Sequence, residues 1–319
     1  MTWLITGGAG YIGGHVAYAF RAAGIPAVVV DDLSTGHARF VPSDVPLVRE
    51  NILDTPALSA IMRGYDVSGV VHVAGFKYAG VSMREPLHTY RTNVQGTLSV
   101  LEAMRESGVD ALVFSSSAAV YGTPAVEIVT EKTPTAPESP YGESKLIGEW
   151  MIAAQGSATG LRHTSLRYFN VVGSGPCAIS DLSPHNLFPL VFAAIERGVS
   201  PHIFGTDYPT PDGTCVRDYV HVQDVAASHV SAALALGREA ELAPVYNLGS
   251  GEGTSVRQIV EAVSRVTGRD ISPKVEARRK GDPARIVADG SLAARDINWR
   301  NRHSLDEMVR TAWAARRAG

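Results

Sequence analysis

The sequence has only two cysteines in 319 residues, Cys177 and Cys215, and no apolar run of about 20 residues. Two thiols without metal-ligand spacing exclude a disulfide framework and favour a reducing, cytoplasmic location. The lack of a long apolar run excludes a membrane-spanning helix. The apolar start of the chain has no basic segment and meets glycine at residue 7, so we expect no secretion signal.

An excess of either charge is also missing. Lys and Arg number 29 against 32 Asp and Glu, which leaves a net charge of −3. No basic stripe indicates nucleic-acid binding, no acidic tail indicates disorder, and 45% hydrophobic residues is typical of a soluble globular protein. The ten histidines form no H-x-x-x-H pair with a carboxylate, so we predict no metal site.

What the sequence does contain is a glycine-rich loop near its start. The apolar run 2–6 is followed at once by GGAGYIG at 7–13 and then by a helix-like stretch. Gly7, Gly10 and Gly13 fit the dinucleotide-binding fingerprint, which needs a tight turn, close approach to a pyrophosphate and close helix packing. The order of strand, glycine loop and helix therefore predicts phosphate binding at the helix N-terminus.

Two acidic residues favour NAD as the dinucleotide. A second apolar strand at 27–30 ends in Asp31 and Asp32, where a carboxylate can accept hydrogen bonds from the adenosine ribose hydroxyls. The next arginine is Arg39, eight residues beyond Asp31, which is too far to indicate a site for the 2′-phosphate of NADP.

Strand-like and helix-like stretches alternate up to about residue 170. The strand-like runs are 2–6, 27–31, 69–75, 111–116 and 161–169. The alternation predicts an α/β fold with a doubly wound parallel Rossmann sheet. Proline and glycine clusters after residue 170 indicate a smaller C-terminal α/β lobe that binds substrate. The expected divisions are 1–170 for the NAD-binding domain and 171–319 for the substrate lobe, with a segment around 216–242 returning to the Rossmann domain.

Tyr141 and Lys145 lie four residues apart in SPYGESKLIGEW, which places both side chains on one face of a helix. A cation beside a phenol stabilises the phenolate, so the spacing predicts a tyrosine base whose pKa is lowered by Lys145. The same spacing also occurs on ordinary solvated helices. The serines at 115–117 follow a strand-like run, at the sheet edge where open α/β folds bind ligands.

Several motifs carry a resemblance to a known family. In order, GGAGYIG, SSSAAVYG and SPYGESK resemble the extended short-chain dehydrogenase/reductase family. Over essentially the full length, further segments resemble the UDP-glucose 4-epimerases of that family. These segments are HVAGFKYAGVS at 72–82, TNVQGT at 92–97, LRYFNVVG at 166–173, the stretch 203–222, YNLGSGEGTSV at 246–256 and RRKGDPARIVAD at 278–289.

The resemblance implies an NAD-dependent isomerase that inverts C4 of a UDP-hexose, interconverting UDP-glucose and UDP-galactose through a transient 4-keto sugar. Tyr141 would be the acid/base, Lys145 would bind the nicotinamide ribose and lower the pKa of Tyr141, and Ser117 would bond the 4-oxygen. The resemblance also implies a homodimer formed by helices within 86–107 and 141–155.

The resemblance assigns further residues to the two ligands. On the cofactor side they are Gly7, Gly10, Tyr11, Ile12, Gly13, Asp31, Asp32, Asn51, Ile52, Val73, Ala74, Gly75, Lys77, Asn93, Tyr141, Lys145 and Phe169. On the nucleotide-sugar side they are Lys77, Ser117, Tyr141, Asn170, Asn186, Leu187, Phe204, Arg217, Arg279, Asp282 and Ile286. Arg217 and Arg279 would bind the diphosphate, or else form structural ion pairs with Asp218 and Asp282.

Three positions depart from the family pattern. Asn51 stands where an acidic residue accepts from the adenine amino group, and its carbonyl oxygen can still accept with less strength. Ile286 stands where a bulky aromatic or a small residue sets the pocket size. Its intermediate size leaves the use of UDP-GlcNAc and UDP-GalNAc open. His185, beside Asn186, has no role that we can assign.

Other functions compete with the epimerase reading. The 4,6-dehydratases resemble one another in an Asp-Glu pair where this chain has Ser116 and Ala118. A uronate decarboxylase or epimerase would need a further cation or hydroxyl cluster, which the sequence leaves open. An NAD-sensing or protein-binding module without catalysis would need the glycine loop but not Ser117, Tyr141 and Lys145.

Overall fold

The computed structural model describes residues 1–175, 179–278 and 283–318. Its largest element is a seven-stranded, all-parallel sheet in the order β11-β7-β5-β4-β1-β2-β3. The strands are β1 (Thr2–Thr6), β2 (Ala27–Asp31), β3 (Leu47–Arg49), β4 (Val67–His72), β5 (Ala111–Ser117), β7 (Arg162–Tyr168) and β11 (Val245–Leu248). The predicted doubly wound α/β fold is confirmed.

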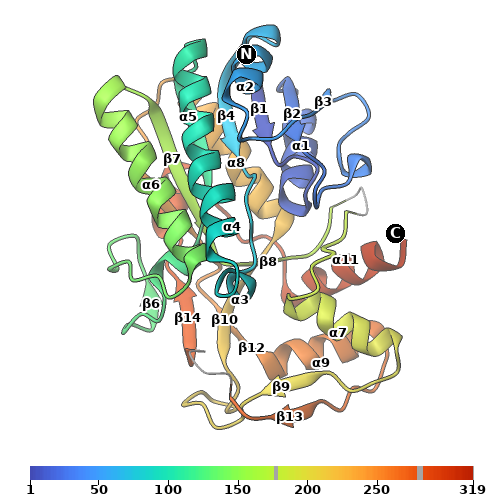
Figure 1. The fold of residues 1–319 in the computed structure, drawn as a ribbon. Coiled ribbons are helices and arrows are strands. Elements are labelled where there is room, and N and C mark those ends of the chain that lie inside the picture. The colour runs from blue at the N-terminus through green and yellow to red at the C-terminus, as the bar shows by residue number, and fades with distance from the viewer. Residues whose placement is uncertain (176–178, 279–282, 319) are drawn as a thin grey trace.

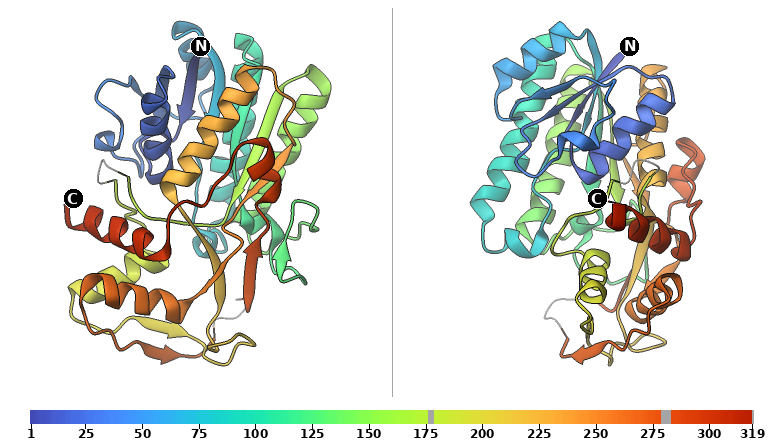
Figure 2. Two further views of the ribbon diagram at one scale, coloured as in Figure 1. Left: turned by 180° about the vertical axis from the view of Figure 1, so that it is seen from behind. Right: turned by 90° about the vertical axis from the view of Figure 1, so that its right-hand side faces the viewer.

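Helices cover both faces of this sheet (Figures 1 and 2). One face carries α1 (Tyr11–Ala22) and α8 (Val222–Gly237), and the other carries α2 (Thr55–Gly64), α5 (Gly96–Ser107) and α6 (Pro140–Thr159). A parallel sheet covered on both faces requires strands that are apolar throughout. Leu4 and Ile5 of β1 point to opposite faces, and neither is exposed at all.

The strand order reverses beside β1, because β2 and β3 lie on one side of it and β4 and β5 on the other. In open α/β sheets this reversal creates a crevice outside the carboxyl ends of the strands, where ligands bind. The loops that follow β1 and β4 meet there. A Cβ added to Gly7 would lie 2.7 Å from Cα of Ala74, so the two loops are in direct contact.

A smaller lobe lies at this carboxyl edge (Figure 1). It contains a sheet in the order β12-β10-β14-β6, with β8 paired to β10, and a two-stranded sheet of β9 and β13. Its strands are β6 (Ile128–Val129), β8 (Asn170–Val172), β9 (His202–Phe204), β10 (Val216–His221), β12 (Gly253–Ser255), β13 (Lys274–Glu276) and β14 (Arg285–Ala288). Its longer helices are α7 (Leu187–Glu196), α9 (Val256–Thr267) and α11 (Leu305–Ala318).

The chain crosses between the two parts more than once. Strand β10 belongs to the smaller lobe, whereas α8, which follows it directly, packs against α1, and β11 then joins the large sheet. Our division at residue 170 remains a proposal about domains.

Local signals fix the ends of the helix that carries the Tyr141 segment. Ser139 caps α6 by accepting a hydrogen bond from the Gly142 N–H at 3.2 Å, and Pro140 stands at the first helical position. Gly160 ends the helix with a φ of +76°. The remaining short helices are η1 (Ala38–Phe40), α3 (Ala79–Ser82), α4 (Pro86–Tyr90), the π-helix η2 (Arg91–Gln95), η3 (Ala118–Tyr121) and α10 (Ser291–Asp296). Within the described part of the chain, no helix is both long and apolar enough to cross a membrane.

Candidate active site

The glycine loop between β1 and α1 is closely packed at the predicted positions. A Cβ on Gly13 would lie 2.1 Å from the carbonyl oxygen of Gly7. Gly7 has a φ of +68°, which other residues rarely adopt. The loop leads into the N-terminus of α1, whose first N–H groups lack partners within the helix and can donate to an anion.

Asp31 lies at the end of β2 beside this loop and is almost fully buried. Its carboxylate accepts hydrogen bonds from the N–H groups of Ala9 and Leu33, both at 2.9 Å. Burial raises the pKa of Asp31, and these two hydrogen bonds oppose the shift. Each carboxylate oxygen keeps a further acceptor site, which suits ribose hydroxyls.

Asn51 joins the other acidic residue of this region. Its side-chain amide donates to Asp32 at 3.0 Å, and its carbonyl oxygen accepts from the Leu53 N–H at 2.9 Å. The Asn51 side-chain oxygen therefore already accepts one hydrogen bond. It keeps one lone pair for the adenine amino group, its predicted partner.

Ser117, Tyr141 and Lys145 meet at the carboxyl end of β5. Ser117 is the last residue of β5, and the other two lie in the first two turns of α6. The side chains of Ser117 and Tyr141 are hydrogen-bonded to each other. The ammonium of Lys145 donates to the carbonyl oxygen of Ser115 at 2.8 Å.

Burial controls the protonation of these groups. It raises the pKa of Tyr141, and the hydrogen bond with Ser117 lowers that pKa by less. It lowers the pKa of Lys145 to about 8, against the opposing effect of the Glu149 charge. That Lys145 lowers the Tyr141 pKa stays a prediction, and the depth of burial that raises this pKa is something that sequence spacing does not reveal.

A cavity of about 210 Å³ opens beside Ser117 and Tyr141 and extends to the smaller lobe. The predicted ligand residues that line it are Tyr11, Ile12, Lys77, Ser117, Tyr141, Phe169, Asn170, Asn186 and Leu187. These residues come from the start of α1 after the glycine loop, the loop after β4, the ends of strands of the large sheet, β8, and the starts of α6 and α7. The cavity thus connects the predicted cofactor loop with part of the predicted substrate lobe.

The segment after β4 lies against Lys145. The expected strand 69–75 ends at residue 72, and a Cβ on Gly75 would lie 3.6 Å from the Lys145 ammonium. Asn93 is buried beside Gly75, and its side-chain oxygen Oδ1 accepts a hydrogen bond from the Phe76 N–H at 2.6 Å. The remaining cofactor-side predictions of this region pack into the cores of the large sheet and are Ile52, Val73 and Ala74.

Some predicted substrate residues are not among the described residues that line the cavity. Phe204 lies at the end of β9, and Arg217 of β10 donates to two backbone carbonyl groups. Ile286 of β14 packs in a small apolar cluster with other side chains of this region. Arg279 and Asp282 lie outside the described residues.

Comparison with known proteins identifies the family. Residues 3–249 match the NAD dependent epimerase/dehydratase family. The chain is 43% identical over 314 residues to the UDP-glucose 4-epimerase of Azospirillum brasilense, covering 97% of this chain and 90% of that protein. It is 41% identical over 318 residues to that of Corynebacterium glutamicum, covering 98% and 95%.

The chain belongs to the NAD dependent epimerase/dehydratase family.

Solved structures agree with this membership. The UDP-glucose-4-epimerase from Stenotrophomonas maltophila, with bound NAD and formylated UDP-arabinopyranose, has a TM-score of 0.95 at 37% identity, covering 100% of this chain and 98% of that one. The UDP-glucose 4-epimerase from Brucella ovis in complex with NAD has a TM-score of 0.94 at 40% identity, covering 98% and 97%.

The residues of this epimerase/dehydratase family member fit NAD. The tight turn in which Gly13 packs against Gly7, the N-terminus of α1 and the buried carboxylate of Asp31 form a cradle for a dinucleotide. The cofactor of the enzyme is NAD. Tyr11 and Ile12 would lie at its phosphates, Asp31 at the adenosine ribose and Lys145 at the nicotinamide ribose.

Sequence patterns missed other residues that line the cavity. Asp181 lies with a carboxylate oxygen 3.8 Å from the Lys77 ammonium and accepts from the Asn186 side chain at 2.7 Å. Arg316 of α11 also lines the cavity and pairs with Glu196 of α7 at 2.7 Å. Both come from irregular or C-terminal segments whose position follows only from tertiary packing, so no local pattern could have found them.

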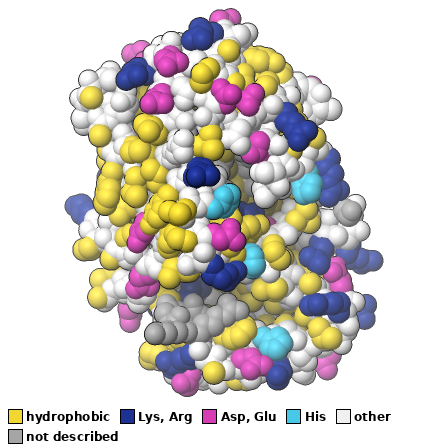
Figure 3. Space-filling view, viewed as in Figure 1, with side chains coloured by type: hydrophobic (Ala, Val, Ile, Leu, Met, Phe, Trp, Pro, Cys, Tyr) yellow, Lys and Arg dark blue, Asp and Glu magenta, His cyan; other side chains and the backbone are white. Residues whose placement is uncertain are grey.

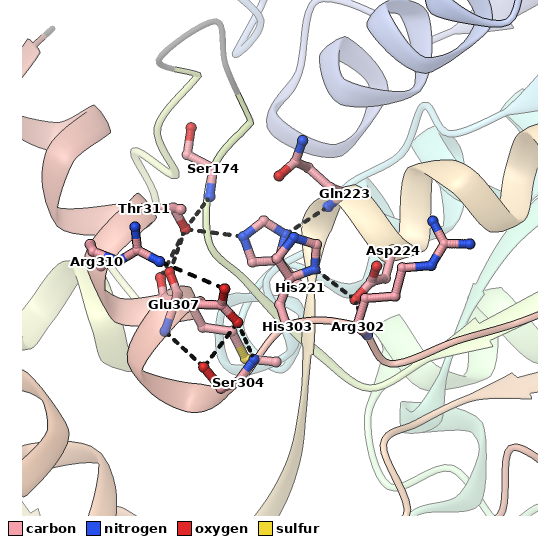
Figure 4. A network of polar contacts seen from close by, with 11 residues as sticks. Ser174, His221, Gln223, Asp224, Arg302, His303, Ser304, Glu307, Arg310 and Thr311 are labelled. Carbon is pink, nitrogen blue, oxygen red and sulfur yellow. Dashed lines mark hydrogen bonds and ion pairs between the residues drawn. The ribbon is translucent and has the colours of Figure 1, made fainter.

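A network of polar contacts holds α11 beside the cavity (Figure 4). The ring of His221, at the end of β10, stacks on His303 with centroids 3.9 Å apart. The Gln223 N–H donates to Nδ1 of His221, so the ring proton of His221 is on Nε2. This Nε2 donates to the Thr311 hydroxyl at 3.0 Å. The same hydroxyl accepts from the Ser174 N–H at 3.2 Å, which ties the cavity wall after β8 to α11.

Proposed function

We propose that this enzyme interconverts UDP-glucose and UDP-galactose by inverting C4 of the hexose. One observation carries the proposal. Ser117, Tyr141 and Lys145 lie together at the end of β5, at a cavity that reaches both the glycine loop and the smaller lobe. The UDP-glucose 4-epimerases that are similar over nearly the full chain support the choice of substrate.

In this reaction Tyr141 removes the proton of the sugar 4-hydroxyl and later returns a proton to the 4-oxygen, so it is a base and then an acid. NAD, when bound, supplies hydride acceptance and return at C4, which makes the sugar a transient 4-keto species. Ser117 donates to the 4-oxygen as its charge develops. Lys145, with a pKa of about 8, is largely charged at pH 7 and stabilises the Tyr141 phenolate.

We assign the nucleotide part of the substrate to the smaller lobe. Asn170 donates to the Asp218 carbonyl at 3.0 Å, which leaves its own carbonyl oxygen available to accept from a hydroxyl. Lys77, which we assign to both ligands, offers a cation to the ribose or phosphate region of NAD. The other residues that we assign to the UDP group are Asn186, Leu187, Phe204, Arg217, Arg279 and Asp282.

Incubating the purified protein with UDP-galactose and no added NAD tests the proposal, and UDP-glucose is the expected product. A 4,6-dehydratase would instead give a 4-keto-6-deoxy sugar. Ser116 is buried and bonded to Glu149, and Ala118 has no polar group, so neither flanking position offers the acid/base pair for loss of water. A protein that binds NAD but does not convert UDP-galactose would instead be an NAD-sensing module without catalysis.

We also propose that the enzyme accepts UDP-GlcNAc in addition to UDP-galactose. Ile286 is smaller than an aromatic residue and is only partly buried beside Phe169. Replacing Ile286 by tyrosine is expected to abolish turnover of UDP-GlcNAc while turnover of UDP-galactose continues, because a ring would occupy space needed by the acetamido group. Equal loss of both activities in a comparison of initial rates would contradict this role.

We propose that the enzyme is a homodimer. An apolar area lies on α4, α5 and α6, where the exposed fractions are 79% for Leu87, 45% for Leu98 and 61% for Trp150 (Figure 3). Exposed apolar groups gathered on neighbouring helices favour a helix-bundle interface. Trp150→Glu is expected to convert the dimer to a monomer, as measured by light scattering after size exclusion.

Val199→Glu serves as the matched control for the dimer, because Val199 is 52% exposed but follows α7 in the smaller lobe. It is expected to leave the mass unchanged. A monomeric wild-type protein, or a dimer that survives Trp150→Glu, would refute the interface.

A further inference from the structure

A buried ion pair that the proposed chemistry does not use lies behind the active site. The guanidinium of Arg167 in β7 binds the carboxylate of Glu149 in α6 through two hydrogen bonds, of 2.5 and 2.8 Å. The side chains are only 6% and 8% exposed. Buried charges require close partners, and this pairing provides them in a bidentate geometry.

Neighbouring groups complete the hydrogen bonding of this pair. The Ser116 hydroxyl donates to Glu149 at 2.5 Å, and Arg167 donates to the Tyr121 hydroxyl at 2.8 Å. That hydroxyl donates in turn to the side chain of Asn247 at 2.7 Å. A network in which these bonds are made holds its members in one arrangement.

The pair connects the elements that carry the catalytic groups. Ser116 lies opposite Arg167 in the register of β5 and β7. It also stands between Ser115, whose carbonyl binds Lys145, and Ser117. Glu149 follows Lys145 by four residues, one turn further along the same helix. The Glu149 carboxylate therefore ties α6 to β5 and β7 next to the catalytic groups.

Glu149 also supplies negative charge to Lys145. Burial lowers the pKa of Lys145 to about 8, and the Glu149 charge opposes this shift. Among the described residues, the imidazole of His72 also interacts with the Lys145 charge, and it is neutral at pH 7. Burial lowers the pKa of His72 in β4 to about 3, and burial raises the pKa of the Tyr141 and Tyr168 phenols. The uncharged ring of Phe114 lies 4.9 Å from the ammonium.

We propose that Glu149 is a positioning residue that, held by Arg167 and Ser116, keeps the Lys145 ammonium charged and aligned with Ser117 and Tyr141. The catalytic consequence rests on the proposed epimerase function. The electrostatic effect on Lys145 does not, and it can be measured separately.

The test follows the titration of Lys145 by NMR in protein carrying ¹³C-labelled lysine. The chain has five lysines, which are Lys77, Lys132, Lys145, Lys274 and Lys280. The Lys145→Arg variant identifies the signal. In the wild type the signal is expected to titrate near pH 8. In Glu149→Gln/Arg167→Gln the midpoint should fall by about one pH unit, since a carboxylate one helical turn away is lost.

The double variant is chosen because removing one partner alone would leave an unpaired buried charge. Ser116→Ala is the matched control, since it removes one hydrogen bond to Glu149 but keeps the charge, and it should leave the midpoint at the wild-type value. Glu149→Asp retains the carboxylate, so its Lys145 midpoint should lie close to the wild-type value and above that of the double variant. If the double variant does not fold, Glu149→Gln alone takes its place.

The activity readout is the alkaline limb of the pH profile of kcat with UDP-galactose. It should move to lower pH together with the NMR midpoint, because loss of the Lys145 charge removes support for the phenolate. An unchanged midpoint in the folded charge-removed variant would overturn the proposal about Glu149. Absence of epimerase activity in the wild-type enzyme would overturn the proposed function. The NMR titration of Lys145 would still test the role of Glu149, because it does not depend on that activity.

Discussion

Replacing Tyr141 by phenylalanine should lower kcat for UDP-galactose by about 10²–10⁴-fold, the usual contribution of a general acid/base. The substitution removes only the hydroxyl and keeps the ring, so the amount of NAD bound to the purified protein should stay at the wild-type level. The measurement is the initial rate of UDP-glucose formation, together with the nucleotide released on denaturation.

Tyr65→Phe is the matched control for this substitution, because Tyr65 follows α2, is 39% exposed and does not line the cavity. Its kcat should equal that of the wild type. If Tyr141→Phe also turned over at nearly the wild-type rate, Tyr141 could not be the acid/base.

Replacing Gly13 by alanine should release NAD from the enzyme. The new Cβ would lie 2.1 Å from the Gly7 carbonyl oxygen, so the loop must move away from α1. Overpacking of this kind costs about 1–3 kcal/mol, which corresponds to NAD binding weaker by about 5- to 150-fold if the cost falls on the bound form. Titration of the purified protein with NAD, followed by tryptophan fluorescence, measures the change.

Gly64→Ala provides the comparison, because nothing lies within 4 Å of a Cβ built at Gly64 near the end of α2. This variant should bind NAD as the wild type does. Unchanged NAD affinity in Gly13→Ala would mean that the glycine loop is not the dinucleotide site.

The sequence predicts the large sheet well because its signals are local. An apolar strand, a glycine loop and a helix follow one another within the first 22 residues, and Ser139 and Gly160 mark the two ends of α6. The smaller lobe is different. Its strands have two to six residues and pair across long separations, as β6 does with β14. In such short strands the alternation of apolar and polar residues does not distinguish a strand from a loop. The pairing of these strands follows from tertiary packing.

The candidate site shows the same contrast. Motifs around Ser117, Tyr141 and Lys145 identified the residues that meet at the end of β5. They did not reveal the carboxylate of Asp181 beside Lys77 or the contribution of α11 to the cavity, because these contacts join distant segments. They also could not show that burial raises the Tyr141 pKa by more than the hydrogen bond with Ser117 lowers it.

The central claim is that the hydrogen on C4 leaves as hydride and returns to the same sugar. Hydride does not exchange with water during such a transfer, unlike a proton held by an acid/base group. The most direct measurement is the conversion of UDP-galactose in D₂O without added NAD, with the product examined by NMR and mass spectrometry. The expected product is UDP-glucose with protium at C4. Deuterium at C4, or no UDP-glucose at all, would contradict the claim.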